Sequence, residues 1–369
     1  MALILTFLGK GGTGKTTMAI AAAKSLAAQG KRVLLAGQDS SPSFGLLLGT
    51  SVGPDPQEIG PNLKAVQFDS TVLLERSWEQ LKKLEAEYVR TPFFKQVYGQ
   101  ELGVLPGMDS ALALNAIREY DADGDYDAIV YDGSGDKDTL RMLGMPEILS
   151  WYLRRFKDVL VDSDLGKALS PFVQPVTSAI FNVSWSSDDI GGKPAQEVNN
   201  LLDRGKAAVS DPSRVVAYLT STSDETAVAT ARYLWGSAQQ VGLTVAGVLV
   251  NPMSDRTLAS EELEAQFAPL PVATMPQRTG DDWQEAIAAL PDLSEGSKAP
   301  RPVEIDVASG KVKLYLPTFD KKQVKLMQYG PEVTIEAGDQ RRNIFLPSQL
   351  RGKPVKGAKF QNGYLIISF

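Results

Sequence analysis

Gly9-Lys10-Gly11-Gly12-Thr13-Gly14-Lys15-Thr16 is the stretch that decides the fold, and it fits the pattern G-x-x-x-x-G-K-[ST]. A short apolar strand, residues 3–8, precedes it, and an Ala-rich helix, residues 18–26, follows it. The glycines let backbone N–H groups approach phosphate oxygens without a Cβ clash, and the helix N-terminus adds partial positive charge. Lys15 is expected to act at the β- and γ-phosphates, and the Thr16 hydroxyl to face Mg²⁺. The sequence therefore predicts a nucleoside triphosphate site.

A second lysine, Lys10, lies inside this loop and gives the run K-G-G-T-G-K-T-T at residues 10–17. Because Lys15 already serves the phosphates of its own loop, Lys10 cannot easily fold back onto the same phosphates. A cation supplied in trans to the charge on a transferred phosphoryl group can raise the rate by about 10³–10⁵. We therefore predict a catalytic role for Lys10 as well as for Lys15. The alternative is a solvated lysine that serves solubility.

The inventory of side chains excludes several kinds of chemistry. The chain has 369 residues with neither cysteine nor histidine, which rules out thiolate or imidazole zinc sites and Ser-His-Asp triads. The oxygen ligands that remain suit Mg²⁺ bound together with ATP or ADP. The apolar runs are shorter than the ~20 residues of a membrane span. Because the chain opens directly on a core strand, we expect no signal peptide, no stable membrane insertion and a cytoplasmic location.

The charge of the chain is unevenly distributed. The formal net charge is −6, yet residues 301–369 carry twelve Lys/Arg and six Asp/Glu. These basic residues are scattered along strands rather than clustered, so we expect no nucleic acid as a partner. Docking of the basic tail against the acidic remainder of the chain, or solubility, explains it better.

Residues 1–290 alternate between apolar strands and helical stretches. The expected strands lie at residues 3–8, 32–36, 127–132, 213–223, 243–251 and 272–275. The alternation predicts an α/β fold with a doubly wound, mainly parallel sheet that binds ligands at the C-terminal ends of its strands. A linker rich in Pro, Gly and Ser is expected at residues 291–302. Alternation of period two then predicts a small all-β sandwich over residues 303–369.

Two segments interrupt this rhythm with apolar residues at helical spacing, at about residues 70–120 and 146–206. Both lie between sheet strands, so we expect helical inserts on one side of the core. The second insert is rich in aromatic residues, which favours a groove for a hydrophobic client protein or segment. The candidate groove residues are Trp151, Phe156, Leu160, Leu169, Phe172, Val176 and Phe181. The alternative is a self-packed helical subdomain.

Two aspartates follow sheet strands and are expected near the phosphates. Asp132 ends an apolar strand and is predicted to hold Mg²⁺, through a water, together with Thr16 and Asp39. Asp39 is predicted to orient the attacking water, because a chain without histidine needs a carboxylate or the phosphate itself as general base. Capping of a turn is the alternative for Asp39. The Gly-rich, charged residues 133–141 are typical of a loop that senses the γ-phosphate.

The remaining nucleotide contacts are expected around the base. Asn251 ends a strand and its amide can pair with the N6 and N7 edge of adenine, although a strand-end Asn can also cap a turn. The predicted nucleotide-binding residues are Gly11, Gly12, Thr13, Gly14, Lys15, Thr16, Thr17, Asn251, Pro276, Gln277 and Arg278.

These motifs resemble those of the arsenical-pump ATPase family, whose best-known eukaryotic members target tail-anchored membrane proteins. The resemblance covers most of residues 1–290 and is carried by K-G-G-T-G-K-T-T, Y-D-A-I-V-Y-D at residues 126–132 and L-P-G-M-D at residues 105–109. It implies Mg-ATP hydrolysis, a homodimer in which Lys10 meets the partner's nucleotide, and a hydrophobic client groove. Residues 315–320, 333–342 and 360–367 are similar to the α-crystallin domain of small heat-shock proteins.

The chain departs from the family at both switch loops. The D-P-A-H-N of the family is here Asp39-Ser40-Ser41-Pro42-Ser43, and its D-T-A-P-T-G-H-T is residues 132–139, D-G-S-G-D-K-D-T. The C-x-x-C pair that holds zinc between subunits is missing, as are thiolate ligands for arsenite, and the ATPase half is not duplicated. We therefore predict no zinc and no role as an arsenite-pump subunit.

Three functions follow from these observations. The first is a homodimeric, Mg-dependent ATPase that gates a hydrophobic client groove, as a chaperone or targeting factor does. The second is a nucleotide-regulated adaptor whose β-sandwich docks folded partners. The third is a positioning or partition-type ATPase, which would need a basic or amphipathic surface that the acidic body does not offer.

Overall fold

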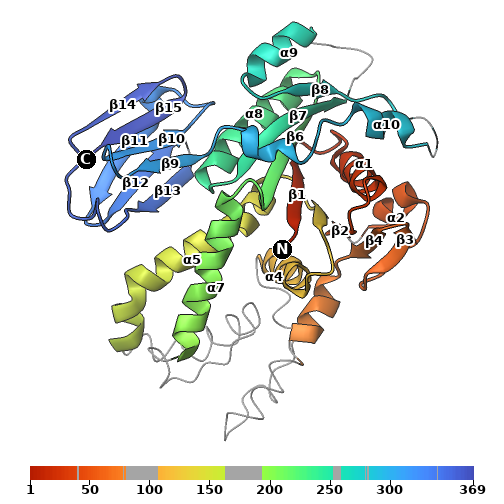
Figure 1. Cartoon of the computed structure of the whole chain (residues 1–369), viewed down its shortest axis with the longest axis horizontal. Helices are drawn as coiled ribbons and strands as arrows, with labels where there is room; N and C mark the ends of the chain where they lie inside the picture. Colours follow the sequence, from red (N-terminus) through yellow and green to blue (C-terminus); the bar gives the residue numbers. More distant parts are fainter. Residues whose placement is uncertain are drawn as a thin grey trace, which may run out of the picture.

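The computed structural model describes residues 1–39, 41–77, 79, 107–162, 193–251, 259–278, 280, 282–338 and 340–369. These residues form a larger α/β body that begins at the N-terminus and a smaller β body that ends at the C-terminus (Figure 1). Within the described ranges, no helix has the length and apolarity needed to cross a membrane.

The larger body is built on one sheet, whose eight strands among the described residues run in the order β3-β4-β2-β5-β1-β6-β7-β8. The strands are β1 Leu3–Leu8, β2 Val33–Gly37, β3 Gln57–Gly60, β4 Leu63–Gln67, β5 Ala128–Asp132, β6 Val215–Thr222, β7 Thr244–Asn251 and β8 Val272–Thr274. All neighbours pair in parallel except β3 and β4. The predicted fold class, a doubly wound and mainly parallel sheet, is confirmed. The sequence analysis missed β3 and β4, which are short and half polar.

Helices cover both faces of this sheet. They are α1 Lys15–Ala28, α2 Ser43–Leu48, α4 Met108–Asp123, α5 Lys137–Asp162, α7 Lys193–Ser210, α8 Glu225–Gln240, α9 Ser260–Phe267 and α10 Gln284–Ala289. One apolar cluster packs α4, the first part of α5, α8 and α9 against one face. A second cluster packs α1, α2 and α10 against the other face. Because both faces are covered, the central strands are apolar throughout rather than alternating.

Helices α5 and α7 lie side by side and project away from the sheet (Figure 1). The expected insert at 146–206 begins inside α5, and that at 70–120 ends inside α4. These helices are therefore shared between the sheet layers and the projecting region. The boundaries of the inserts stay predictions.

The smaller body is a sandwich of two antiparallel sheets, ordered β14-β15-β10-β9 and β11-β12-β13. The strands are β9 Val303–Asp306, β10 Lys311–Tyr315, β11 Val324–Tyr329, β12 Glu332–Ala337, β13 Gln340–Phe345, β14 Gly357–Gln361 and β15 Tyr364–Ser368. Their inward residues form a separate apolar cluster. Residues 291–302 pack against the larger body, because Leu293 is buried in the cluster that contains α1.

Candidate nucleotide-binding site

The loop between β1 and α1 has the backbone conformation that its glycines make possible. Gly12 and Gly14 have φ angles of 82° and 88°, in the left-handed region that other residues rarely adopt. A Cβ at Gly14 would overlap Nδ2 of Asn251, and open space surrounds the Cβ positions of Gly11 and Gly12. Helix α1 begins at Lys15, so the N–H groups of its first turn have no partner within the helix. The loop therefore presents backbone donors and open space, which fits a phosphate group.

Lys15 lies over its own loop. Its Nζ donates to the carbonyl oxygens of Gly9 at 3.1 Å and Lys10 at 3.2 Å. Burial lowers the pKa of Lys15, while the carboxylates of Asp132 and Asp136 act in the opposite direction. The ammonium group thus has only weak carbonyl partners, which phosphate oxygens can replace. Lys10, in contrast, is exposed, as are Gly11 and Gly12 beside it.

Asp132 ends β5 and is 6% exposed. Burial raises the pKa of Asp132 to about 6, and the nearby charge of Asp39 adds to the rise. A hydrogen bond from the Thr16 side chain and the charge of Lys15 act against it. Thr16, Asp132 and Asp39 therefore lie near one another at the C-terminal ends of β1, β2 and β5, as predicted.

Asp39 is exposed and closes a turn. Its carboxylate accepts from the N–H and the hydroxyl of Ser41, both at 2.8 Å. Gln67 donates to the carbonyl oxygens of Asp39 at 2.6 Å and Ser41 at 2.9 Å. In this conformation Asp39 caps the turn, which is the alternative that the sequence left open, and its predicted role toward water stays a prediction.

The donor set near Thr16 suits Mg²⁺. It consists of a hydroxyl and carboxylates, the oxygen ligands that this ion prefers. The described residues contain no group of three or more Asp, Glu, His or Cys that could hold a metal ion by itself. Such sparse protein ligation fits an ion that keeps several waters and is bound mainly through nucleotide phosphates.

The loop after Asp132 connects the phosphate loop to α5. The carbonyl oxygen of Gly135 accepts from the N–H of Gly9 at 2.8 Å. Gly135 has φ 66°, and a Cβ there would overlap the Lys15 side chain. Asp136 accepts from the Ser134 hydroxyl at 2.7 Å and from the N–H of Asp138 at 2.9 Å, in the first turn of α5. A movement of this loop would therefore displace both the Lys15 side chain, which lies against Gly135, and the first turn of α5.

Three residues of this site were not singled out by the sequence analysis. Gly135 and Asp136 were within the predicted sensing loop, but no pattern assigned them individual contacts with Lys15. The Thr220 hydroxyl lies 3.0 Å from that of Thr13. These two threonines are 207 positions apart, so no local signal could have joined them.

Of the residues predicted around the base, Asn251 lies beside the loop. Its Nδ2 donates to the carbonyl oxygen of Thr13 at 2.6 Å. The guanidinium group of Arg278 stacks 4.4 Å from the ring centroid of Trp283, and its Nη1 is buried without a hydrogen-bond partner among the described residues. Pro276 is half-buried and Gln277 exposed. One amide hydrogen of Asn251 is thus used by the phosphate loop, and the roles of Pro276, Gln277 and Arg278 toward the base stay predictions.

The predicted client groove falls mostly outside the described residues. Trp151 is half-buried on α5 and makes an edge-to-face contact with Tyr152, with the ring centroids 5.1 Å apart. Ile148 and Tyr152, on the same helix, are 46% and 50% exposed. Phe156 and Leu160 belong to α5, but their side chains are not among those described. Leu169, Phe172, Val176 and Phe181 lie outside the described residues.

The sheet and its glycine loop define a P-loop nucleotide-binding protein. A sequence model of the anion-transporting ATPase family matches residues 2–273, and the chain belongs to this family. A second model, an HSP20-like domain found in ArsA, matches residues 309–369. The chain is thus an ATPase with an HSP20-like C-terminal domain, and the family resemblance predicted from the motifs is confirmed.

The similar proteins align with this chain over different lengths. Putative arsenical pump-driving ATPases of Prosthecochloris vibrioformis and Chlorobaculum tepidum are each 28% identical over 99% of this chain and 95% of their own length. The ATPase GET3 of Malassezia globosa is 28% identical over 50% of this chain and 53% of its own length. The first two relatives therefore align with this chain across both of its domains, whereas the third aligns with half of it.

Proposed function

We propose that this protein is a homodimeric, Mg-dependent ATPase that uses ATP binding and hydrolysis to gate a hydrophobic client groove. The observation that carries the proposal is the continuity from the phosphate loop to α5. Gly135 bonds Gly9 on one side, and α5 begins two residues further on, at Lys137. The same helix carries the exposed apolar side chains of Ile148 and Tyr152. A shift of the loop at the start of α5 on phosphate binding would therefore move the helix that carries this apolar surface.

In this proposal the phosphates lie on the glycine loop. The backbone donors of residues 11–17 and the ammonium group of Lys15 hold them, while Asn251 and residues 276–278 lie along the base. Thr16 and Asp132 hold Mg²⁺ together with the phosphates, Asp132 through a water. Asp39 leaves its turn with Ser41 and orients the attacking water. When bound, the metal offsets the charge that develops on the transferred phosphoryl group.

Lys10 supplies the second cation from the partner subunit. Its exposure beside the open face of Gly11 and Gly12 supports this role, because a partner's phosphates can reach an exposed ammonium group. The homodimer thereby couples the two sites. GET3-type relatives support a dimeric ATPase of the chaperone or targeting class, and the client here is a hydrophobic protein or segment.

Mixing two inactive variants tests the dimer and the cross-subunit lysine together. Lys10→Ala leaves its own site intact but removes the ammonium group offered to the partner. Asp39→Asn inactivates its own site but still offers Lys10. A mixed dimer then has one complete site, so random pairing should restore about one quarter of the wild-type rate. Failure of the mixture to recover any hydrolysis would contradict a lysine acting in trans.

Client binding is tested by photo-crosslinking from position Tyr152 in lysate, with and without ATP. We expect capture of apolar segments that depends on nucleotide. A matched probe at Lys325, exposed on the sandwich, should capture none. Capture of folded partners from Lys325 alone would favour the adaptor function instead.

The adaptor function has one specific observation in its favour. Residues 351–359 carry four exposed basic side chains, Arg351, Lys353, Lys356 and Lys359, and no acidic one. A folded partner with an acidic surface would complement this segment. In that case, hydrolysis would time the docking of that partner.

A further inference from the structure

Helix α5 has two parts that meet different neighbours. Its first turns follow the phosphate-sensing loop, and Leu140, Met142 and Leu143 are buried in the core of the α/β body. Pro146 lies inside the helix, where it removes a backbone hydrogen bond and allows a bend. Beyond Pro146, Ser150 accepts from Lys206 of α7, and Arg154 pairs with Glu332 of the sandwich. The proline thus separates the sensing end of the helix from the end that meets the C-terminal domain.

The sandwich is attached to α8 through buried contacts. The ring of Tyr315 meets the buried ring of Trp235 edge to face, with centroids 6.1 Å apart. Arg342 on β13 donates from Nη1 to the carbonyl oxygen of Gln239 at 2.7 Å. This carbonyl, which also accepts from the N–H of Gly242 at 3.2 Å, lies in the last turn of α8, where the helix dipole attracts cations. Burial lowers the pKa of Arg342 to about 10, and Glu147 acts in the opposite direction.

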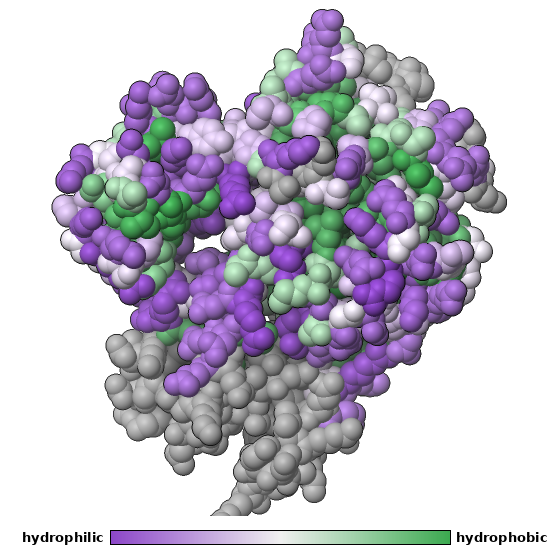
Figure 2. Space-filling view, viewed as in Figure 1, coloured by the Kyte–Doolittle hydropathy of each residue, from purple (hydrophilic) through white to green (hydrophobic). Residues whose placement is uncertain are grey.

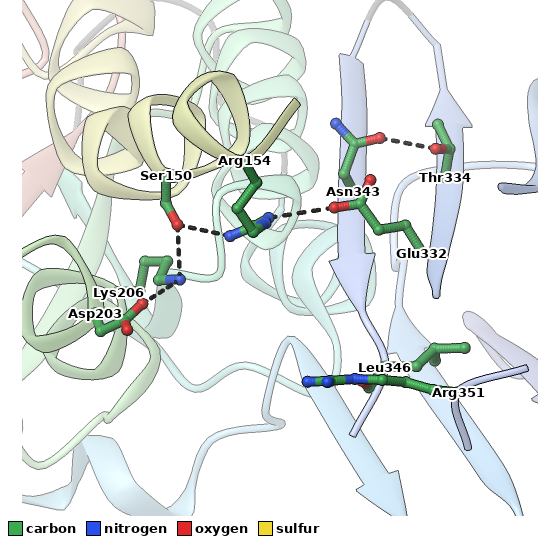
Figure 3. A network of polar contacts seen from close by, with 9 residues as sticks. All are labelled: Ser150, Arg154, Asp203, Lys206, Glu332, Thr334, Asn343, Leu346 and Arg351. Atoms are coloured by element: carbon green, nitrogen blue, oxygen red, sulfur yellow. Dashed lines mark hydrogen bonds and ion pairs between the residues drawn. The ribbon is translucent and has the colours of Figure 1, made fainter. Parts of the chain in front are cut away.

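The attachment of the sandwich to α5 is more open (Figure 3). Arg154 on α5 pairs with Glu332 on β12 at 3.3 Å, and the two side chains are 30% and 14% exposed. The Arg154 guanidinium also lies 5.0 Å from the ring centroid of Phe345. The Ser150 hydroxyl accepts from Arg154 at 2.6 Å and from Lys206 of α7 at 3.1 Å. Among the described residues, the pair of Arg154 and Glu332 thus links the helical pair α5–α7 to the sandwich.

These two attachments differ in strength. The α8 contact buries two aromatic rings and a guanidinium group, whereas the α5 contact is polar and lies at the rim of the seam. The space-filling view shows a small opening between the two bodies, which touch above it (Figure 2). A partly exposed ion pair contributes less than buried aromatic packing. If α5 moves relative to α8, the contact between Arg154 and Glu332 breaks first.

We propose that the HSP20-like domain is a latch: fixed on α8, it holds the part of α5 beyond Pro146 in the position described here through Arg154 and Glu332. A movement of α5 during the nucleotide cycle breaks this contact. The inference rests on the proposed function in one respect, that nucleotide moves α5. By reciprocity, a contact that favours one position of α5 shifts the affinity for ATP, and its loss shifts that affinity the other way.

The first test measures binding of a non-hydrolysable ATP analogue to the full chain. Glu332→Gln and Arg154→Gln should each change the apparent dissociation constant by about two- to fivefold and in the same direction, the range for one partly exposed pair. The double variant should gain no more than either single one, because both remove the same contact. Glu304→Gln is the matched control, since Glu304 pairs with Lys313 inside the sandwich at 3.5 Å. Unchanged affinity in Glu332→Gln would overturn the latch.

The second test follows distances between spin labels. The chain has no cysteine, so cysteines introduced in pairs are labelled specifically. Positions Arg155 on α5, Ala229 on α8 and Lys359 on the sandwich are all exposed. With the ATP analogue, we expect the 155–229 and 155–359 distances to change and the 229–359 distance to stay constant.

The outcomes separate the latch from the proposed function. A changed 155–229 distance with an unchanged 155–359 distance means that the sandwich travels with α5, which overturns the latch and leaves the proposed function standing. No change in the 155–229 distance means that nucleotide does not move α5, which overturns both.

Discussion

Replacement of Asp132 by Asn separates the stability of the nucleotide site from its chemistry. The carboxyl group of Asp132 is 6% exposed, and its burial raises the pKa from 3.8 to about 6. The folded chain therefore holds a proton on Asp132 more tightly than the unfolded chain does. Above pH 6 this group is ionised in both states, and burying the charge costs stability. Asn keeps an acceptor for the Thr16 side chain and carries no charge.

The size of the effect follows from the pKa difference. A shift of about two units corresponds to about 3 kcal/mol at pH 8. At pH 5 Asp132 is largely protonated in the folded state, and the cost is about 1–2 kcal/mol smaller. Asp132→Asn should therefore stabilise the nucleotide-free protein, and its advantage over wild type should grow by about 1–2 kcal/mol from pH 5 to pH 8. That difference corresponds to a few °C in Tm.

The assay is thermal or urea unfolding without nucleotide at pH 5 and pH 8, paired with ATP hydrolysis at pH 8. We expect a more stable protein with no Mg-dependent hydrolysis. Asp224 is a control whose pKa is shifted in the opposite direction. Hydrogen bonds from the side chains of Thr222 and Thr226 lower its pKa, so its charged form stabilises the folded chain. Asp224→Asn should destabilise the chain at both pH values. If Asp132→Asn has the same advantage at pH 5 and pH 8, the carboxyl group is not a desolvated charge and the reasoning fails.

Three further predictions concern the loops around the phosphates. Lys10→Ala should lower hydrolysis by about 10³-fold or more while nucleotide still binds; unchanged turnover, measured beside Lys10→Arg, would refute the catalytic role in trans. Asp39→Asn should trap an ATP-bound dimer, seen by size-exclusion chromatography with Mg-ATP; normal turnover would place the water-orienting role elsewhere. Gly135→Ala should cost about 1–3 kcal/mol and abolish hydrolysis, because a Cβ there overlaps Lys15 at a left-handed φ. Gly60→Ala is its control, with open space around the Cβ position; equal unfolding free energies for the two variants would contradict this.

The sequence predicted the parts of the fold that local patterns encode. The glycine loop, the long apolar strands and Asp132 at the end of β5 all follow from residues close together in the chain. Strands β3 and β4 were missed because they are short and half polar. Their pairing is set by neighbours in the sheets rather than by hydrophobic alternation.

Contacts between distant segments could not be predicted at all. The hydroxyl pair of Thr13 and Thr220, and the bond from Asn251 to Thr13, join residues more than 200 positions apart. Each arises because parallel strands end at the same edge of the sheet. The sequence placed Asn251 at that edge correctly, but only the structure shows that one amide hydrogen serves the phosphate loop.

The basic charge of the C-terminal segment was expected to dock against the acidic body or to serve solubility. Arg342 reaches the body, but its partner there is the backbone carbonyl of Gln239. The ion pair between the two bodies has the opposite polarity, because Arg154 belongs to α5 and Glu332 to the sandwich. The basic side chains of residues 351–359 are exposed. The described contacts between the bodies thus depend on directed partners and on aromatic packing, not on net charge. Such contacts are specific to one orientation. Added salt should therefore weaken a partner held by residues 351–359 more than it weakens the attachment of the sandwich to α8, because exposed charges are screened and the buried guanidinium of Arg342 is not.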